Sequence, residues 1–232
     1  MPRVIAIVGP TATGKTSLSI ALAQHLNTDI ISADSQVIYQ GLDIGTAKPT
    51  TEEMAGIPHH MLDRALPNEH YSVARYETEA TPILESLLSK GKTPIVVGGT
   101  GFYIRALLES HFLPDVPPNE SFREGMNQLV SEKGSPFLHA QLAEKDPERA
   151  AALHPNDAVR IIRALEIIHE TGKPVPKPSD ATPKRFDVCW LGLTYADRDT
   201  HRRIIDERID DMLETGWLDE VQSLMDRYGA DA

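Results

Sequence analysis

The stretch that decides the fold opens the chain and reads Val4-Ile5-Ala6-Ile7-Val8-Gly9-Pro10-Thr11-Ala12-Thr13-Gly14-Lys15-Thr16. The apolar run over 4–8 predicts a buried parallel strand. Residues 17–26 carry apolar side chains at helical spacing and predict a helix. Between them, residues 9–16 satisfy the spacing G-x-x-x-x-G-K-[ST] of a phosphate-binding loop. Because this motif requires the order strand, loop, helix, the stretch predicts an α/β fold with a P-loop.

The residue types in this loop suit a phosphate chain. The two glycines allow backbone N–H groups to approach an anion closely, and the following helix directs its positive end at the same place. Lys15 supplies a cation, and the Thr16 hydroxyl can ligate Mg²⁺. The loop leaves open which bond breaks. The predicted binding residues are Gly9, Pro10, Thr11, Ala12, Thr13, Gly14, Lys15 and Thr16.

Length and composition limit the class of protein. A chain of 232 residues makes one large domain, or a core with an appendage. It has no apolar run of bilayer-spanning length, and it opens on a strand rather than a signal peptide. The single cysteine, Cys189, sits in an apolar run, which predicts a buried core residue rather than a nucleophile. We therefore expect a cytoplasmic protein without a membrane segment.

The charge is strongly acidic but unevenly distributed. A formal net charge of −11 argues against broad nucleic-acid binding. Residues 160–208, in contrast, carry 10 Lys or Arg and 8 Asp or Glu. Any contact with a polyanion would need a local basic face from this stretch. An ordinary mixed surface explains the charge equally well.

Polar residues follow a second predicted strand, at 29–32. Because ligands of open α/β sheets bind beyond the carboxyl ends of the strands, Asp34 is placed to face the P-loop. It could act as a general base, or it could cap the next helix or hold Mg²⁺ through water. In the loop that follows, Thr46 and Lys48 could reach an anion or stay in solvent. The adjacent His59 and His60 are not a convincing metal site, since neighbouring side chains point apart.

A second strand–glycine loop–helix unit covers residues 94–108, after a helix predicted at 72–89 with Ser72 as its N-cap. Its strand has no terminal Asp, unlike the Mg²⁺-holding strand of an NTPase. Thr100 sits in the glycine loop at the start of the helix. Two roles stay open for it, a substrate contact and helix capping.

Prolines after residue 111 predict a domain boundary. Residues 113–184 form the predicted insertion, with helices near 121–132, 136–144, 147–153 and 156–171 and a basic, proline-rich loop after them. The core is predicted at 1–112 and 185–232, returning through a strand at 186–193. A helix over 197–214 is expected to turn Ile205, Ile209, Met212 and Leu213 inward. Arg208 shares this face, so it needs an anion or a carboxylate partner. A last helix is predicted over 217–225.

Several motifs occur together in a characteristic order. They are Gly9-Pro10-Thr11-Ala12-Thr13-Gly14-Lys15-Thr16, Ser32-Ala33-Asp34-Ser35, Asp43-Ile44-Gly45-Thr46-Ala47-Lys48-Pro49, Gly98-Gly99-Thr100-Gly101-Phe102-Tyr103, and His154-Pro155-Asn156-Asp157 with Arg163-Ala164-Leu165-Glu166. The set resembles the tRNA dimethylallyltransferase family, the tRNA isopentenyltransferases of bacteria, over residues 1–229. That family usually continues past residue 232 with a further helical segment and a basic stretch.

The resemblance implies a P-loop NTPase-like α/β core, with a parallel sheet flanked by helices, and an all-helical insertion that grips tRNA. The implied reaction moves a dimethylallyl group from dimethylallyl diphosphate to N6 of adenine 37, beside the anticodon. It gives N6-(dimethylallyl)adenosine in tRNAs that read codons beginning with U. The implied cofactor is Mg²⁺ and the implied partner is the anticodon stem-loop of tRNA. We expect a monomer.

Roles for single residues follow from the same resemblance. Asp34 matches the general base toward N6, Thr100 a residue at the tRNA site, and Arg208 an arginine near the diphosphate. Lys15, together with Thr16 and Mg²⁺, would neutralise the leaving group. The implied catalytic set is Lys15, Asp34, Thr100 and Arg208. The positions that match tRNA-contacting stretches are Asp34, Ser35, Gln36, Val37, Thr100, Arg123, Val159, Arg160, Ile161, Ile162 and Arg163.

Two other functions share parts of this pattern. A small-molecule or nucleotide kinase would use the same P-loop and Mg²⁺, with Asp34 facing a hydroxyl acceptor. The sequence has neither an arginine-rich lid nor a Walker-type Asp to support it. A nucleotide-gated switch or RNA-binding module without catalysis is the second alternative, and the sequence has no guanine-reading Asn-Lys-x-Asp.

Overall fold

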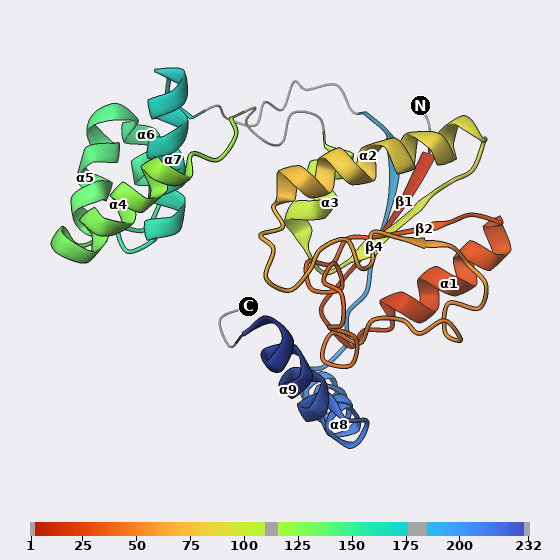
Figure 1. Cartoon of the computed structure of the whole chain (residues 1–232). Coiled ribbons are helices and arrows are strands. Elements are labelled where there is room, and N and C mark those ends of the chain that lie inside the picture. The colour runs from red at the N-terminus through yellow and green to blue at the C-terminus, as the bar shows by residue number, and fades with distance from the viewer. Residues whose placement is uncertain (1–2, 110–115, 176–184, 230–232) are drawn as a thin grey trace. The chain divides into compact units, whose positions relative to one another are not determined.

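The computed structural model describes residues 3–109, 116–175 and 185–229 (Figure 1). Packing divides the chain into two compact units, formed by residues 1–110 with 183–232 and by residues 111–182. The boundary predicted at 112/113 lies outside the described residues, and the one at 184/185 borders on them. The exact limits therefore stay a prediction.

The first unit alternates strands and helices. Its elements are β1 (Arg3–Val8), α1 (Lys15–Leu26), β2 (Ile30–Ser32), β3 (His59–His60), α2 (Val73–Ser89), β4 (Ile95–Gly98), α3 (Gly101–Leu108), β5 (Asp187–Gly192), α8 (Arg198–Glu214) and α9 (Trp217–Tyr228). All strand pairings are parallel, in the order β3-β2-β4-β1-β5. The strand β1 therefore lies between β4 and β5. The predicted P-loop α/β core is confirmed.

Alternate side chains of β1 serve two separate cores. Val4 and Ala6 are fully buried against a cluster that includes α2 and α3, whereas Ile7 belongs to a cluster with Ile20 and Ala23 of α1. Because both faces of this strand are covered, its sequence is an unbroken apolar run. Figure 1 shows α1 on one side of the sheet and α2 with α3 on the other. The carboxyl ends of β1, β2 and β4 then meet at one edge.

The second unit is helical throughout its described part. It consists of α4 (Glu120–Lys133), α5 (Ser135–Lys145), α6 (Pro147–Ala151) and α7 (Ala158–Thr171). Leu138, Leu142, Ile161 and Leu165 form the centre of its core. Asp157 caps α7 by accepting from Arg160 N, as the break before this helix predicts.

One buried carboxylate joins two helices of this unit. Glu166 of α7 is fully buried. It accepts from Arg123 Nε of α4 at 2.8 Å, from Asn119 N at 2.7 Å, and from Arg163. Burial raises the pKa of Glu166, but these hydrogen bonds outweigh it, so the pKa lies below the ordinary 4.5. The carboxylate is therefore charged at neutral pH and fixes α4 against α7.

Two expectations were wrong. Cys189 is exposed, since β5 is an edge strand and Trp190 beside it is 50% exposed. Ile209 and Leu213 are 39% and 44% exposed, since only one side of α8 is covered within the described residues, and Met212 alone is buried there.

Two further features add to the predictions. The side chains of Ile161 and Ile162 are buried in the helical core, so a contact with tRNA at these positions would have to come from their backbone. The strand β3 was not predicted, because its two residues are too few for a periodic pattern.

Replacing the buried carboxylate should weaken the second unit. We expect Glu166→Gln to lower the free energy of unfolding by about 2 kcal/mol, because two partly solvated arginines lose their anion. Glu170→Gln is the matched control one turn later, since Glu170 bonds Asn119 at an exposed position. Urea unfolding followed by circular dichroism checks both variants. Equal stability of the two would contradict the role of Glu166.

The loss of stability caused by Glu166→Gln should depend on pH. Because the folded pKa of Glu166 is depressed, its stabilisation is complete above its unfolded pKa near 4.5 and is lost as the pH falls through its lower folded value. The difference in unfolding free energy between wild type and Glu166→Gln should then be constant from pH 7 to 5 and shrink below that. A difference that grows on acidification would be inconsistent with this account.

Candidate functional site

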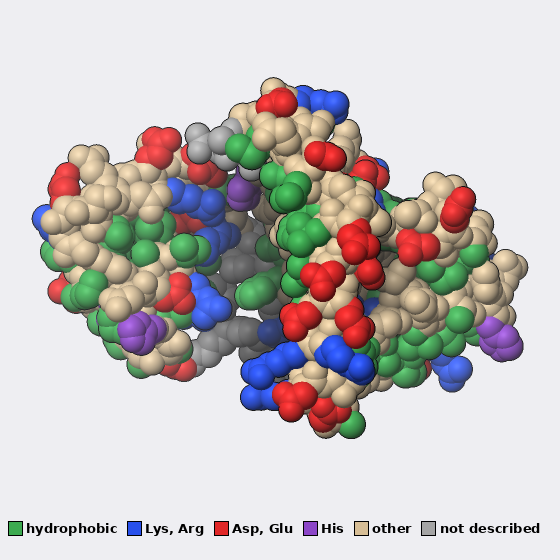
Figure 2. All heavy atoms as spheres, turned by 90° about the horizontal axis from the view of Figure 1, so that it is seen from below, with side chains coloured by type: hydrophobic (Ala, Val, Ile, Leu, Met, Phe, Trp, Pro, Cys, Tyr) green, Lys and Arg blue, Asp and Glu red, His purple; other side chains and the backbone are tan. Residues whose placement is uncertain are grey.

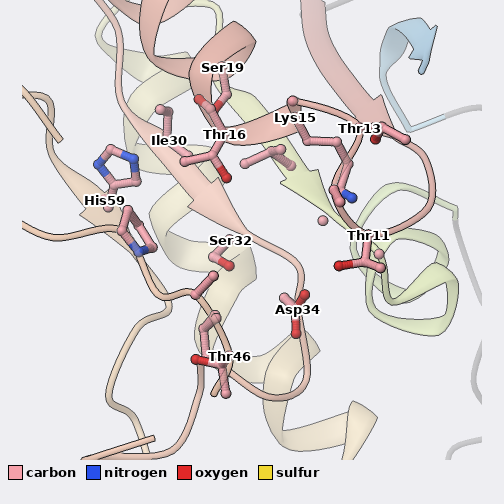
Figure 3. Close-up of a pocket in the computed structure, with 18 of the residues that line it drawn as sticks. Thr11, Thr13, Lys15, Thr16, Ser19, Ile30, Ser32, Asp34, Thr46 and His59 are labelled. Atoms are coloured by element: carbon pink, nitrogen blue, oxygen red, sulfur yellow. The ribbon is translucent and has the colours of Figure 1, made fainter. Parts of the chain in front are cut away.

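A cavity of about 390 Å³ lies at the carboxyl edge of the sheet in the first unit. Figure 3 shows Lys15 and Thr11 of the P-loop on one side and Asp34, after β2, on another. Arg208 of α8 and Thr46 of the loop after β2 also line it. The volume falls in the range of small-ligand pockets, so the cavity can enclose a diphosphate with a short chain.

The conformation of the P-loop is fixed by hydrogen bonds within the loop and by hydrogen bonds from residues much later in the chain. Lys15 Nζ donates to Pro10 O at 2.6 Å, and Thr13 Oγ1 donates to the same carbonyl at 2.9 Å. Tyr195 OH, from the segment before α8, donates to Ala12 O at 3.0 Å, and His201 Nε2 of α8 contacts Thr11 O at 2.9 Å. A Cβ on Gly9 would lie 2.5 Å from Leu193 O, so only glycine fits at this turn.

Two cations face the cavity. Arg208 donates to Thr11 Oγ1 at 2.9 Å and more weakly to Thr46 O at 3.4 Å. Within the described residues no carboxylate forms an ion pair with Arg208 or Lys15. Partial burial lowers the pKa of Lys15, Asp34 raises it and Arg208 lowers it, and the net pKa lies below 10.5. The partners of Arg208 within the described residues are therefore neutral oxygens, and its contact with an anion in the cavity stays a prediction.

Asp34, Ser35 and Thr100 are brought together by the pairing of β2 with β4. Ser35 N donates to Thr100 Oγ1 at 2.9 Å, and Thr100 N donates to Ala33 O at 3.1 Å. Thr100 is the N-cap residue of α3, but its side chain makes no cap bond and instead contacts Ser35. Asp34 Oδ1 accepts from Gln36 N at 2.9 Å and closes a turn, not a helix. Its carboxylate lines the cavity across from Lys15 (Figure 3).

The loop over 37–49 forms a wall of the same cavity through Val37, Thr46 and Ala47. Lys48 does not reach into it. Its ammonium is buried, and it donates to Asp43 Oδ1 at 2.6 Å, Asp63 Oδ1 at 2.5 Å and Tyr39 O at 2.8 Å. The idea that Lys48 meets an anion ligand was therefore wrong. Its role is to hold the loop.

Thr16 lines the cavity at the first turn of α1, and its hydroxyl makes no hydrogen bond to the described chain. The Thr16 hydroxyl is an oxygen donor of the kind that Mg²⁺ prefers, and the oxygens of a phosphate chain can complete the coordination. Among the described residues no three His, Cys, Asp or Glu side chains gather as a metal site. The residues therefore fit a magnesium ion that the phosphates themselves help to hold.

The remaining predicted tRNA contacts belong to the second unit. Val159 is 81% exposed, and the Arg160 side chain is also largely exposed. Arg123 and Arg163 are bound to Glu166, and Arg163 also donates to Val116 O at 2.7 Å. Arg123 also lies 3.5 Å from Glu120, so the two arginines face two carboxylates. Direct contact of these residues with RNA stays a prediction.

Several residues of the site were missed from the sequence. Tyr195 and His201 lie outside any motif, and nothing local indicates that they reach the P-loop. His59 contacts Ile57 O through Nδ1, and its Nε2 is buried without a partner among the described residues. Burial lowers the pKa of His59, so a neutral ring lines the cavity. Glu220 was also overlooked, because an acidic residue on a surface helix is ordinary.

The outer face of the first unit is mostly acidic. The helix α8 carries exposed acidic side chains at Asp199, Asp206, Glu207, Asp210, Asp211 and Glu214. Figure 2 shows acidic side chains gathered in a band on the face seen from below. Such a surface repels a polyanion. In the described parts of the chain no helix has the length and apolar character needed to cross a membrane.

The fold and the cavity together define a P-loop α/β protein in which Lys15, Arg208 and Asp34 line one cavity. Residues 37–232 match the model of the family described as IPP transferase. The tRNA dimethylallyltransferase of Symbiobacterium thermophilum is 44% identical over 230 residues, which are 98% of this chain and 72% of that protein. That of Bacillus subtilis is 44% identical over 226 residues, 97% of this chain and 72% of the relative. This chain belongs to the IPP transferase family.

Solved structures agree with this assignment. The full-length tRNA isopentenylpyrophosphate transferase from Bacillus halodurans has a TM-score of 0.69 and 42% identity, over 100% of this chain and 73% of that one. A eukaryotic dimethylallyltransferase described as acting on tRNA gives a TM-score of 0.82 at 34% identity, over 100% of this chain and 57% of that one. The predicted family, and a tRNA prenyltransferase as the class of enzyme, are confirmed over the kinase alternative.

The close approach of β4 to β2 requires a glycine at position 98, and this requirement can be tested. A Cβ on Gly98 would lie 2.1 Å from Ala33 O, next to Asp34, whereas one on Gly99 would meet nothing within 4 Å. We expect Gly98→Ala to destabilise the protein by about 1 to 3 kcal/mol through overpacking. Gly99→Ala, the matched control, should change stability by less than about 0.5 kcal/mol. Thermal unfolding measures both, and equal effects would contradict the packing argument.

Proposed function

We propose that this chain transfers a dimethylallyl group from dimethylallyl diphosphate to N6 of adenine 37 in tRNAs that read codons beginning with U. The observation that carries the proposal is the cavity itself, in a chain of this family. It sets two cations, Lys15 and Arg208, around the space that Asp34 also faces, and neither forms an ion pair with a carboxylate of the described chain. An allylic diphosphate needs cations for its leaving group, and a weak amine nucleophile needs a base.

Each residue then has a distinct task. The P-loop amides, Lys15 and Arg208 bind the diphosphate and stabilise the charge that grows on it as the allylic C–O bond breaks. The carboxylate of Asp34 takes the proton from N6 as the new C–N bond forms. The bond from Ser35 N to Thr100 Oγ1 fixes the turn that carries Asp34. Thr100 therefore positions the base and borders the adenine.

Magnesium completes the proposed site. Thr16 would hold the ion together with phosphate oxygens, and the ion would supply further positive charge to the bound diphosphate. The RNA partner is the anticodon stem-loop, which must present its adenine unstacked because N6 is out of reach in a stacked loop. Arg160 and Val159 are the exposed candidates for RNA contact in the second unit.

The direct test uses the purified chain with Mg²⁺, dimethylallyl diphosphate labelled in the prenyl group, and unmodified tRNA whose anticodon is followed by adenine. Label in the adenine of the RNA is the expected result. ATP labelled at the γ-phosphate serves as the second donor. Label from γ-phosphate in any acceptor, with none from the prenyl group, would favour the kinase and overturn the proposal.

Lys15→Ala should weaken binding of inorganic diphosphate at least about 100-fold, because the partly buried ammonium is a direct counter-charge. The fold should persist, since Lys15 bonds only Pro10 O within the described chain. Calorimetric titration measures the affinity, with Lys90→Ala as a control of equal charge change. The affinity of the wild type for diphosphate should fall as the pH rises, because deprotonation of Lys15 removes the cation. Since the pKa of Lys15 lies below 10.5, this fall should occur at a lower pH than it would with an ordinary lysine. Unchanged affinity of Lys15→Ala would refute the P-loop assignment.

Asp34→Asn should reduce kcat at least about 100-fold while tRNA affinity stays within about threefold. Asparagine keeps an oxygen that can accept from Gln36 N, so the turn is preserved and only the base is lost. Single-turnover assays give the chemical rate, and filter binding gives the RNA affinity. Turnover at the wild-type rate would rule out Asp34 as the base.

A further inference from the structure

A carboxylate near the end of the chain binds three consecutive backbone amides of the loop that walls the cavity. Glu220 of α9 accepts from Asp43 N at 2.8 Å and Ile44 N at 2.7 Å through Oε2, and from Gly45 N at 3.0 Å through Oε1. Three adjacent N–H groups that point one way form a concave positive site. Hydrogen bonds to a charged acceptor are stronger than neutral ones, so this contact fixes the loop firmly.

The helix α9 is shaped to lie along this loop. A Cβ on Gly45 would lie 2.1 Å from Trp217 Nε1, and one on Gly41 would lie 3.2 Å from Leu224 Cδ2. Side chains one and two turns apart on α9 thus pack against the backbone of residues 41–45. The carboxylate between them is aimed by this packing, and the loop cannot move away without losing both contacts.

The loop transmits this fixation to the cavity. Its chain closes on itself by Ala47 N to Ile44 O and Lys48 N to Asp43 O, both 2.9 Å. Thr46 and Ala47, within this closed turn, line the cavity. The carbonyl of Thr46 also accepts from Arg208, one of the two cations. The position of the cavity wall, and one contact of Arg208, therefore depend on the amides that Glu220 binds.

We propose that Glu220 is a positioning residue for the diphosphate cavity: through the backbone amides of Asp43, Ile44 and Gly45 it holds Thr46 and Arg208 in place for the bound ligand. The identity of this ligand as a prenyl diphosphate rests on the proposed function. The residue itself lies outside the lining of the cavity, so it acts through the loop and not by touching substrate.

The test compares Glu220→Gln and Glu220→Ala with Asp219→Asn. Asp219 shares the first turn of α9 and gives the same change of charge, but it makes no hydrogen bond to the loop. Hydrogen–deuterium exchange of the peptides covering 41–49 should become at least about tenfold faster in the Glu220 variants and stay unchanged in the control. Affinity for inorganic diphosphate should fall about tenfold in the Glu220 variants alone.

Steady-state kinetics add a second readout. KM for dimethylallyl diphosphate should rise about tenfold in the Glu220 variants with kcat changed less than about threefold, since the base Asp34 is untouched. Gly45→Ala, which forces Trp217 away, should reproduce the effect with Glu220 intact. Wild-type exchange and wild-type diphosphate affinity in Glu220→Ala would overturn the inference. If the wild type binds diphosphate but transfers no prenyl group, the proposed function fails, and the exchange and affinity results still decide the role of Glu220.

Discussion

Lys15 and Arg208 bring two positive charges to one partly buried cavity, and no carboxylate of the described chain pairs with either. Burial is the main cause that lowers the pKa of Lys15, and the charge of Arg208 lowers it further, while Asp34 opposes both. The protein must therefore hold both cations in place by other contacts. The P-loop carbonyl of Pro10, the Thr11 hydroxyl and the Thr46 carbonyl do so with neutral oxygens. The proposed diphosphate would supply the negative charge that these neutral oxygens do not.

Much of this arrangement can be predicted from local sequence. The apolar run of β1 follows from a strand that is covered on both faces. The spacing of the P-loop follows from backbone amides that must be free to approach an anion. The glycine before α3 follows from the close approach of Gly98 to Ala33. Asp34 and Thr100 could be placed because the ends of neighbouring parallel strands meet at one edge. These inferences need no knowledge of distant contacts.

The parts that could not be predicted depend on contacts between remote segments. Lys48 looked like a candidate for an anion until the structure showed Asp43 and Asp63 around its ammonium. Cys189 was misjudged because an apolar strand gives no sign that it lies at an edge. In α7, Ile161 and Ile162 share a motif with Arg163, yet helical periodicity turns the isoleucines inward. A motif identifies a stretch, and burial decides which of its side chains can meet a ligand.

Glu220 is synthesised long after the loop that it binds, and this order affects how the cavity forms on the ribosome. It lies 177 residues after Asp43, whose amide it binds, and β5, which completes the pairing of β1, is also late. At ordinary translation rates, roughly 9 to 35 s separate the two partners of that contact. Until α9 emerges, the nascent P-loop and its strand are present while the loop over 43–45 has no carboxylate to bind. The loop over 43–45 is thus fixed only after the residues that line the cavity have been made.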